Sequence, residues 1–159
     1  MTKGNRLAIS GLVLSALGAT GITQYEGYRD KAYLDQGGVP TIGYGTTINV
    51  RIGDTITKDR ALTYLKAHAA ADEVRMKKCI GDVPLYQHEW DAYVSFSYNV
   101  GWKAFCGSSV VRKLHETPPN YSGACDAMLP WNKIKGKINK GLVNRRTKEH
   151  AICAGVKAL

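Results

Sequence analysis

Two carboxylic residues and a threonine follow one another at short intervals near the start of the chain. Glu26 is followed nine positions later by Asp35, and Thr41 stands six positions further on. Hydrolysis of a glycosidic bond uses such a pair of carboxyl groups, because an acid protonates the leaving oxygen while a carboxylate attacks the sugar or activates water. Glu26 adjoins an apolar segment, which suits the acid, and Asp35 lies in a polar, glycine-rich turn, which suits the base. The Thr41 hydroxyl can hold the water.

Each of these residues also has an ordinary structural interpretation. Glu26 fits a solvated helix position, Asp35 fits a turn that its own side chain stabilises, and Thr41 fits a β-strand. The spacing alone therefore does not establish a catalytic site. The longer string of residues around it decides between the two interpretations.

The local pattern predicts which elements carry these three side chains. The helical pattern that contains Glu26 is expected to continue to about Lys31, and residues 35–38 form a turn signal. Residues 39–48 combine β-branched and aromatic residues with glycines, which predicts a β-hairpin. A carboxyl group on a helix would then face another beside a hairpin, as on the two walls of a cleft.

Three blocks of sequence resemble the phage lysozymes, the endolysins of glycoside hydrolase family 24. Residues 26–46, EGYRDKAYLDQGGVPTIGYGT, are similar to the family signature E-G-x-R-x-x-x-Y-x-D-x-x-G-x-x-T-I-G-x-G. Residues 84–101 resemble the long central helix of the family, and residues 141–149, GLVNRRTKE, resemble its C-terminal block G-L-x-x-R-R-x-x-E. The resemblance extends over residues 23–155, and the blocks follow in the family's order.

The resemblance implies an α+β fold that is mostly helical and two-lobed, with a small β-hairpin beside the cleft. It implies cleavage of the β-1,4 bond between N-acetylmuramic acid and N-acetylglucosamine in peptidoglycan, with inversion, and no metal or cofactor. Glu26, Asp35 and Thr41 match the catalytic positions of the family. By the same resemblance, Asn99 is expected to contact the sugar. Further substrate-side residues are Arg145 and Arg146, one of which is expected to pair with Glu26, unless the two are an exposed basic pair.

An apolar stretch precedes the catalytic motif. Residues 7–25 carry no charge for 19 positions, which as a helix would span about 28 Å, close to the thickness of a bilayer core. Seven of these residues are Leu, Ile or Val and ten are Gly, Ala, Ser or Thr, so the segment is only weakly apolar. Lys3 and Arg6 precede it, which favours a cytoplasmic N-terminus. A cleaved signal peptide, a buried helix and an uncleaved temporary anchor all fit this pattern, and the third fits the adjacency to Glu26 best.

The extra segment resembles that of signal-anchor-release endolysins, which are exported and wait at the inner membrane until the helix leaves the bilayer. The resemblance implies an N-terminal apolar anchor helix over residues 1–24 and a lysozyme domain over residues 25–159. It also implies a periplasmic location and transient membrane contact through residues 7–25. No cysteine lies within residues 1–78, so a disulfide switch in the anchor is not expected.

The chain has four cysteines and no zinc-like spacing of cysteine and histidine. An even number in a small exported chain favours two disulfides, for which three connectivities are possible. We favour the pairs in which each disulfide brackets one helical block, and four reduced, buried cysteines are the alternative. The favoured pairs are Cys79 with Cys106 and Cys125 with Cys153.

The formal net charge of +9 favours anionic partners without choosing among nucleic acid, lipid headgroups and cell wall. Residues 133–148 are rich in lysine and arginine and contain no acid, which fits either a solvated surface or one that faces a polyanion. We expect a monomer that acts on glycan strands and does not bind nucleic acid. The alternatives are a lytic transglycosylase and a non-catalytic cationic protein that binds cell walls or membranes.

Overall fold

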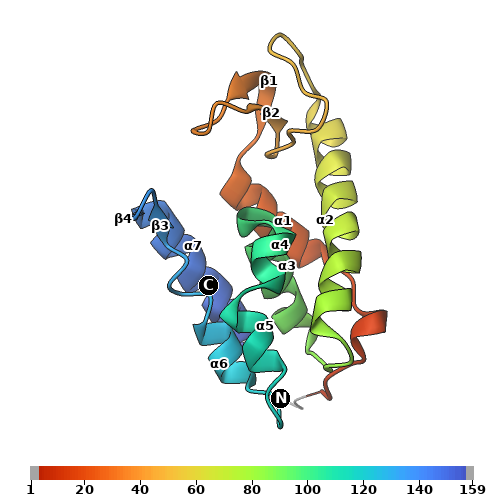
Figure 1. The fold of residues 1–159 in the computed structure, drawn as a ribbon. Helices are drawn as coiled ribbons and strands as arrows, with labels where there is room; N and C mark the ends of the chain where they lie inside the picture. Colours follow the sequence, from red (N-terminus) through yellow and green to blue (C-terminus); the bar gives the residue numbers. More distant parts are fainter. Residues whose placement is uncertain (1–3, 157–159) are drawn as a thin grey trace.

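The computed structural model describes residues 4–156, which are mostly helical with two small antiparallel sheets of two strands each (Figure 1). Lys3, one of the basic residues that precede the apolar stretch, lies outside the described residues. In chain order the elements are η1 (Ile9–Gly11), α1 (Ala16–Glu26), β1 (Arg29–Leu34), β2 (Pro40–Gly43), α2 (Lys58–Ile80), α3 (Gln87–Val100), α4 (Trp102–Cys106), α5 (Ser109–Leu114), α6 (Tyr121–Asp126), β3 (Lys133–Ile134), β4 (Lys137–Ile138) and α7 (Lys140–Cys153).

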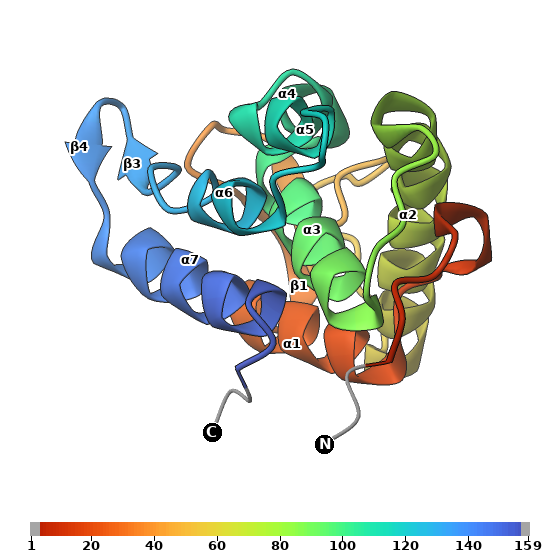
Figure 2. The same ribbon diagram turned by 90° about the horizontal axis from the view of Figure 1, so that it is seen from below.

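Helix α3 is the centre of the hydrophobic core. Nine consecutive residues, 89–97, are buried, which confirms the apolar helix expected in this part of the chain. Trp90, Tyr93 and Phe96 are fully buried and together fill the space between α3 and its neighbours. Figure 2 shows α3 with α1, α2, α4, α6 and α7 arranged around it. Elements from both ends of the chain are therefore positioned by one buried helix.

The long helix α2 runs from the β1–β2 sheet to the opposite end of the molecule (Figure 1). It begins directly after a capping residue, because the side chain of Thr57 accepts a hydrogen bond from the backbone N–H of Arg60. Its buried face includes Leu65, Ala69 and Met76, which pack into the same core as α3. This helix therefore connects the β1–β2 sheet to the helical body.

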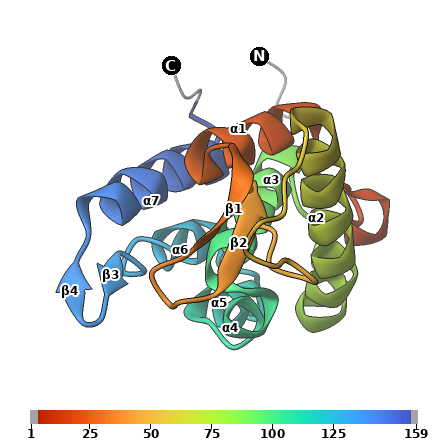
Figure 3. The ribbon, with the colours of Figure 1, turned by 90° about the horizontal axis from the view of Figure 1, so that it is seen from above.

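The β-hairpin differs from the one that the sequence predicted over residues 39–48. Strand β1 starts at Arg29, so the helix that was expected to reach Lys31 ends at Glu26. β1 pairs with β2 across the turn at Asp35, with Thr41 opposite Tyr33. Strand β2 therefore pairs with a strand that precedes the turn, and only a single bridge, between Ile42 and Thr46, lies within the predicted range. Figure 3 looks onto this hairpin, which lies beside α1 and α2 over one end of the helical body.

The apolar stretch over residues 7–25 is not a single helix in this structure. The short 3-10 turn η1 and helix α1 are separated by extended residues, and α1 itself packs on α3 and ends at the candidate acid, Glu26. Within residues 4–156, no helix is both long enough and apolar enough to cross a membrane.

Buried carboxylates of the helical body prevent a continuous helix between η1 and α1. The backbone N–H of Leu14 donates to Glu73 over 2.8 Å, and the same carboxylate oxygen accepts from the indole N–H of Trp90. The backbone N–H of Ser15 donates to Asp91 over 2.9 Å, and its hydroxyl donates to the other oxygen of that carboxylate. Because these N–H groups bond to side chains, they are not available to a helix that runs through residues 12–15. Composition alone could not indicate this.

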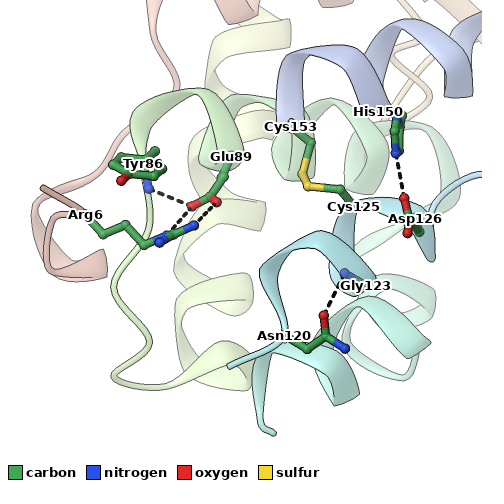
Figure 4. The surroundings of a disulfide bond; sticks show 9 residues. All are labelled: Arg6, Tyr86, Glu89, Asn120, Gly123, Cys125, Asp126, His150 and Cys153. Carbon is green, nitrogen blue, oxygen red and sulfur yellow. Dashed lines mark hydrogen bonds and ion pairs between the residues drawn. A yellow bond between two sulfur atoms is a disulfide. The ribbon is translucent and has the colours of Figure 1, made fainter. Parts of the chain in front are cut away.

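A third buried carboxylate holds the chain just before the apolar stretch. The guanidinium of Arg6 donates to both oxygens of Glu89, over 3.1 and 2.8 Å, and Glu89 is only 3% exposed. The same guanidinium lies over the rings of Tyr86 and Tyr121, at 4.3 and 3.4 Å from their centres. Figure 4 shows Arg6 with Glu89 and Tyr86. Bidentate pairing of this kind is geometrically specific, so it fixes where the N-terminal segment enters the body.

The four cysteines form the two disulfides that the sequence favoured. Cys79 is bonded to Cys106, which ties the end of α2 to α4, and Cys125 is bonded to Cys153, which ties α6 to α7. Figure 4 shows the second bond, and an ion pair between His150 and Asp126 joins the same two helices. Each bond therefore connects elements that pack against one another in the folded protein.

We expect the two disulfides to contribute similar amounts to stability, because they close loops of nearly equal length, 27 and 28 residues. In the chain-entropy model each is worth about 3–4 kcal/mol in the free energy of unfolding. Urea unfolding of the two double variants, Cys79→Ala with Cys106→Ala and Cys125→Ala with Cys153→Ala, measures this. A loss of less than about 1 kcal/mol in either variant would contradict the expectation.

Candidate active site

Glu26 is the last residue of α1, and the helix ends there because the next residue leaves helical conformation. Gly27 has a φ of 65°, in the left-handed region that glycine adopts without strain. The Glu26 side chain is 20% exposed, and its Oε1 accepts a hydrogen bond from Arg145 Nη1 over 2.7 Å. Its other oxygen, Oε2, faces Gly45, where an added Cβ would lie at 3.3 Å. One oxygen is thus held by a cation and the other adjoins a position without a side chain.

The guanidinium of Arg145 is itself held on three sides. Besides Glu26, its Nε donates to Glu149 Oε1 over 3.0 Å and its Nη2 donates to the backbone carbonyl of Ser95 over 3.1 Å. The hydroxyl of Ser95 donates to the same oxygen of Glu149 over 2.7 Å. Arg145 is 7% exposed and Glu149 is fully buried. The cation that orients Glu26 therefore has a fixed position set by α3 and α7.

Arg146 occupies a different place, which resolves the choice that the sequence left open. Its Nη2 donates to Asn99 Oδ1 over 2.9 Å, and its guanidinium lies over the ring of Phe96. Its Nε is 2.9 Å from Glu149 Oε2, an ion-pair distance, although the N–H does not point at that oxygen well enough for a hydrogen bond. Both arginines are buried, so the interpretation as an exposed basic pair is wrong.

Burial of the Glu149 carboxyl has a large electrostatic consequence. Desolvation raises the pKa of Glu149, and the adjacent Arg146 and Arg145 guanidinium groups oppose this shift. A buried carboxylate with two cations and a hydroxyl donor around it remains compensated in a medium of low polarity. The sequence motif included Ser95 and Glu149 without giving them a role. The signal for Glu149 was its spacing, because residues three and four positions apart lie on the same side of a helix.

Asp35 and Thr41 are linked through the backbone of a single residue, Val39, in the turn between β1 and β2. Asp35 Oδ1 accepts from the backbone N–H groups of Gly37 and Val39, over 2.8 and 2.9 Å. The carbonyl of Val39 accepts from the hydroxyl of Thr41 over 2.9 Å. Asp35 is half-buried and Thr41 is buried. The turn thus fixes one Asp35 oxygen, and the Thr41 hydroxyl keeps its lone pairs as acceptors.

Tyr98 connects α3 to the residues that surround Glu26. Its hydroxyl donates to the carbonyl of Tyr44 over 2.7 Å, directly before the glycine that faces the carboxyl group. Its burial raises the pKa of the Tyr98 phenol, and the nearby Glu26 carboxylate acts in the same direction. Sequence reasoning did not single out Tyr98 or Gly45. The only signal for either was membership of the resembling blocks.

Asn99, expected to contact sugar, lies at the exposed end of α3 next to Tyr98. Because its carbonyl oxygen accepts from Arg146, its amide N–H₂ is the end of the side chain that is left to donate. Among residues 4–156, no group of three or more histidine, cysteine, aspartate and glutamate side chains could hold a metal ion. The carboxyl groups of Glu26 and Asp35 are suited to proton transfer.

Comparison with known proteins gives consistent matches over most of the chain. A family model described as phage lysozyme matches residues 23–149. An endolysin of Acyrthosiphon pisum secondary endosymbiont phage 1 is 38% identical over 143 residues, covering 87% of this chain and 96% of that protein. A SAR-endolysin of Pseudomonas phage phiKMV is 36% identical over 145 residues, covering 87% of this chain and 86% of that protein. Among solved structures, the muramidase domain of SpmX from Asticaccaulis excentricus has a TM-score of 0.80 at 30% identity, covering 89% of this chain and 97% of that one.

The buried network predicts a large stability loss when Glu149 loses its charge. Glu149→Gln keeps the shape of the side chain but leaves Arg146 buried without its carboxylate partner. Removal of one partner of a buried ion pair costs about 3–5 kcal/mol. Urea unfolding should show a loss of this size, whereas Glu116→Gln, at an exposed ion pair, should change stability by less than about 0.5 kcal/mol. Small and equal losses of unfolding free energy in the two variants would show that the network is not needed to hold α7 on α3.

Proposed function

The chain belongs to the phage lysozyme family, and from this premise we propose that it is an endolysin of glycoside hydrolase family 24. It hydrolyses the β-1,4 bond between N-acetylmuramic acid and N-acetylglucosamine in peptidoglycan and so lyses the bacterial host. The observation that carries the proposal is Glu26, held by the buried Arg145 in the part of the chain that the family model matches. The protein acts as a monomer without cofactor.

Glu26 is the general acid in this proposal. Its Oε1 is engaged with Arg145, so Oε2, which faces Gly45, is the atom that carries and donates the proton. The absence of a side chain at position 45 leaves room for the glycosidic oxygen beside Oε2. Protonation of that oxygen makes it a neutral leaving group and lets charge develop on the sugar ring.

Asp35 acts as the base, and Thr41 helps to hold the attacking water. Two backbone N–H groups fix Asp35 Oδ1, so Oδ2 is assigned as the oxygen that accepts the proton of the water. The Thr41 hydroxyl, whose hydrogen is directed to Val39, can accept a hydrogen bond from the same water. Attack by a water on the face opposite to the leaving group inverts the anomeric centre. Asn99 donates its amide hydrogens to the sugar.

The first test compares Glu26→Gln with Asp30→Asn, a matched control that removes an exposed carboxylate four residues away. Release of reducing ends from purified peptidoglycan should fall by about 10²–10⁴-fold in Glu26→Gln, because a general acid contributes about that factor. The control should retain its activity, and circular dichroism should show that both variants are folded.

The products of the same assay distinguish the alternatives. A lytic transglycosylase yields an anhydro ring in place of a reducing end, and a non-catalytic wall-binding protein gives no products from any variant. Equal release by the wild type and Glu26→Gln would remove Glu26 from the mechanism.

We further propose that the protein is of the signal-anchor-release type. It is exported to the periplasm, and residues 7–25 are held in the inner membrane before release. In that state residues 1–24 are the anchor and residues 25–159 are the lysozyme domain. Relatives include a protein named SAR-endolysin, and the weak apolarity of the segment suits a helix that can leave a bilayer.

The contacts of residues 6–15 support a mechanism of control for this proposal. With the segment in a bilayer, Glu73, Glu89 and Asp91 would lose their hydrogen-bond partners in residues 6–15. Glu26, at the end of α1, would be held at the lipid surface away from Arg145. Release then allows α1 to pack on α3 and brings Glu26 to the cation.

This proposal predicts that a more apolar segment is retained longer in the membrane. Gly11 and Gly21 have room for a side chain, since nothing lies within 4 Å of an added Cβ at either position. Leucine favours the bilayer centre by about 0.3–0.6 kcal/mol per residue. Gly11→Leu with Gly21→Leu should therefore shift protein from the soluble periplasmic fraction to the inner membrane and delay lysis.

The matched control is Gly107→Leu, outside the segment, where an added Cβ makes only ordinary contacts at 3.6 and 3.9 Å. The control should fractionate like the wild type. All purified proteins, once folded, should hydrolyse peptidoglycan equally. Unchanged fractionation of the double variant would contradict the anchor, and it would leave the hydrolase proposal untouched.

A further inference from the structure

We propose that the β3–β4 hairpin is a second membrane contact, which binds the surface of an anionic lipid bilayer in the folded, released protein. The contact, here called the hairpin surface, consists of three lysines and three apolar side chains. They are Lys133, Lys135, Lys137, Trp131, Ile134 and Ile138.

The hairpin has a regular but minimal structure. Lys133 pairs with Ile138 and Ile134 pairs with Lys137, and the two-residue turn has positive φ at Lys135 and Gly136. Directly opposite residues of an antiparallel pair project from the same face. Each face of the hairpin therefore presents one isoleucine beside one lysine.

The apolar side chains of this surface are only partly covered by the rest of the protein. Ile138 is 71% exposed, and Ile134 and Trp131 are each 37% exposed. Trp131 packs against Phe96 in an edge-to-face arrangement and leaves part of its side chain open to solvent. The two isoleucines project from opposite faces, so the contact is the hairpin as a whole rather than one flat face. Exposed apolar side chains on a strongly basic hairpin are typical of interaction surfaces.

The charge of the surface is uncompensated. Within residues 4–156, none of the three lysines forms an ion pair, and no acidic residue occurs between positions 127 and 148. In the same stretch Arg145 and Arg146 are buried and paired with glutamates, whereas Lys140 and Lys148 are exposed on α7. The lysines are therefore free to attract an anionic partner.

The combination of charge and apolar groups favours a bilayer over a soluble polyanion. A carboxylate- or phosphate-bearing polymer would need the lysines only. An anionic bilayer attracts the lysines to its headgroups, while tryptophan and isoleucine enter the boundary between headgroups and acyl chains. Tryptophan in particular is suited to that boundary, since its ring is apolar and its N–H is polar.

The hairpin surface is separate from the N-terminal segment. In Figures 1 and 2 the β3–β4 hairpin and η1 lie on opposite sides of the molecule. The inference therefore does not depend on the anchor proposal. A folded enzyme that had left the bilayer at its N-terminus could still stay close to the membrane by this surface.

The test uses the full, folded protein and vesicles of phosphatidylethanolamine with phosphatidylglycerol, against vesicles of phosphatidylcholine alone. Wild type should sediment with the anionic vesicles only. The triple variant Lys133→Gln, Lys135→Gln, Lys137→Gln should bind them at least about tenfold more weakly. The matched control changes three exposed lysines of α2, Lys58, Lys66 and Lys78, to Gln and should bind at least several-fold better than the hairpin variant.

The apolar part of the proposal has its own comparison. Ile138→Ser should weaken vesicle binding, whereas Ile48→Ser, at a residue that is 74% exposed elsewhere, should not. Brominated acyl chains in the anionic vesicles should quench fluorescence of the wild type, and this quenching should disappear in Trp131→Phe.

Three results would overturn the inference. The first is equal vesicle binding by the two triple variants, which would indicate that binding depends only on the net charge of the protein. The second is vesicle binding without quenching of Trp131, which would indicate that the N-terminal segment contacts the bilayer instead of the hairpin. The third is a hairpin variant that binds vesicles normally but loses hydrolysis of purified peptidoglycan, which would assign the surface to the cell-wall polymer.

Discussion

The buried guanidinium of Arg145 is the interaction on which the candidate site depends. It lies where α1, α3 and α7 meet, and it bonds to Glu26, Ser95 and Glu149, which come from these three helices. A cation at this depth is tolerated only because each of its donors has an acceptor. The packing of the three helices therefore determines where Glu26 lies. A change in that packing would move Glu26, and loss of Glu26 would remove a contact between α1 and α7.

The sequence predicted the elements whose signals are local. Helix α2 has a capping threonine and an apolar stripe, and α3 has consecutive apolar positions, and both were found where these patterns lie. The boundary after Glu26 was predicted wrongly because it depends on non-local pairing. β1 starts at Arg29, since it bonds to residues that follow the turn, and this pairing outweighed a helical pattern that ran on to Lys31.

The sequence indicated which residues form the candidate site, but it did not indicate which of them contact one another. The resembling motif supplied Glu26, Asp35 and Thr41, and whether they act as proposed is for experiment to decide. The choice between Arg145 and Arg146 was beyond the sequence, because neighbours on a helix differ in direction by about 100° and the direction of Glu26 depends on how α1 crosses α7. The role of Glu149 follows only when both arginines are placed, since it compensates the two together.

The composition of the apolar segment follows from the contacts that it makes in the folded protein. Ser15 caps α1 and bonds to Asp91, and Gly18 lies so close to that carboxylate that an added Cβ would stand 2.9 Å from it. A larger apolar side chain at either position would disturb these contacts, whereas Leu17, 82% exposed on the same helix, adds little to the core. A segment built only for the bilayer would not need the first feature, and one built only for the folded body would not need the second. A segment that must occupy both a bilayer and this body is forced to be weakly apolar, because the small and hydroxyl residues that dock it are those that weaken its hold on lipid.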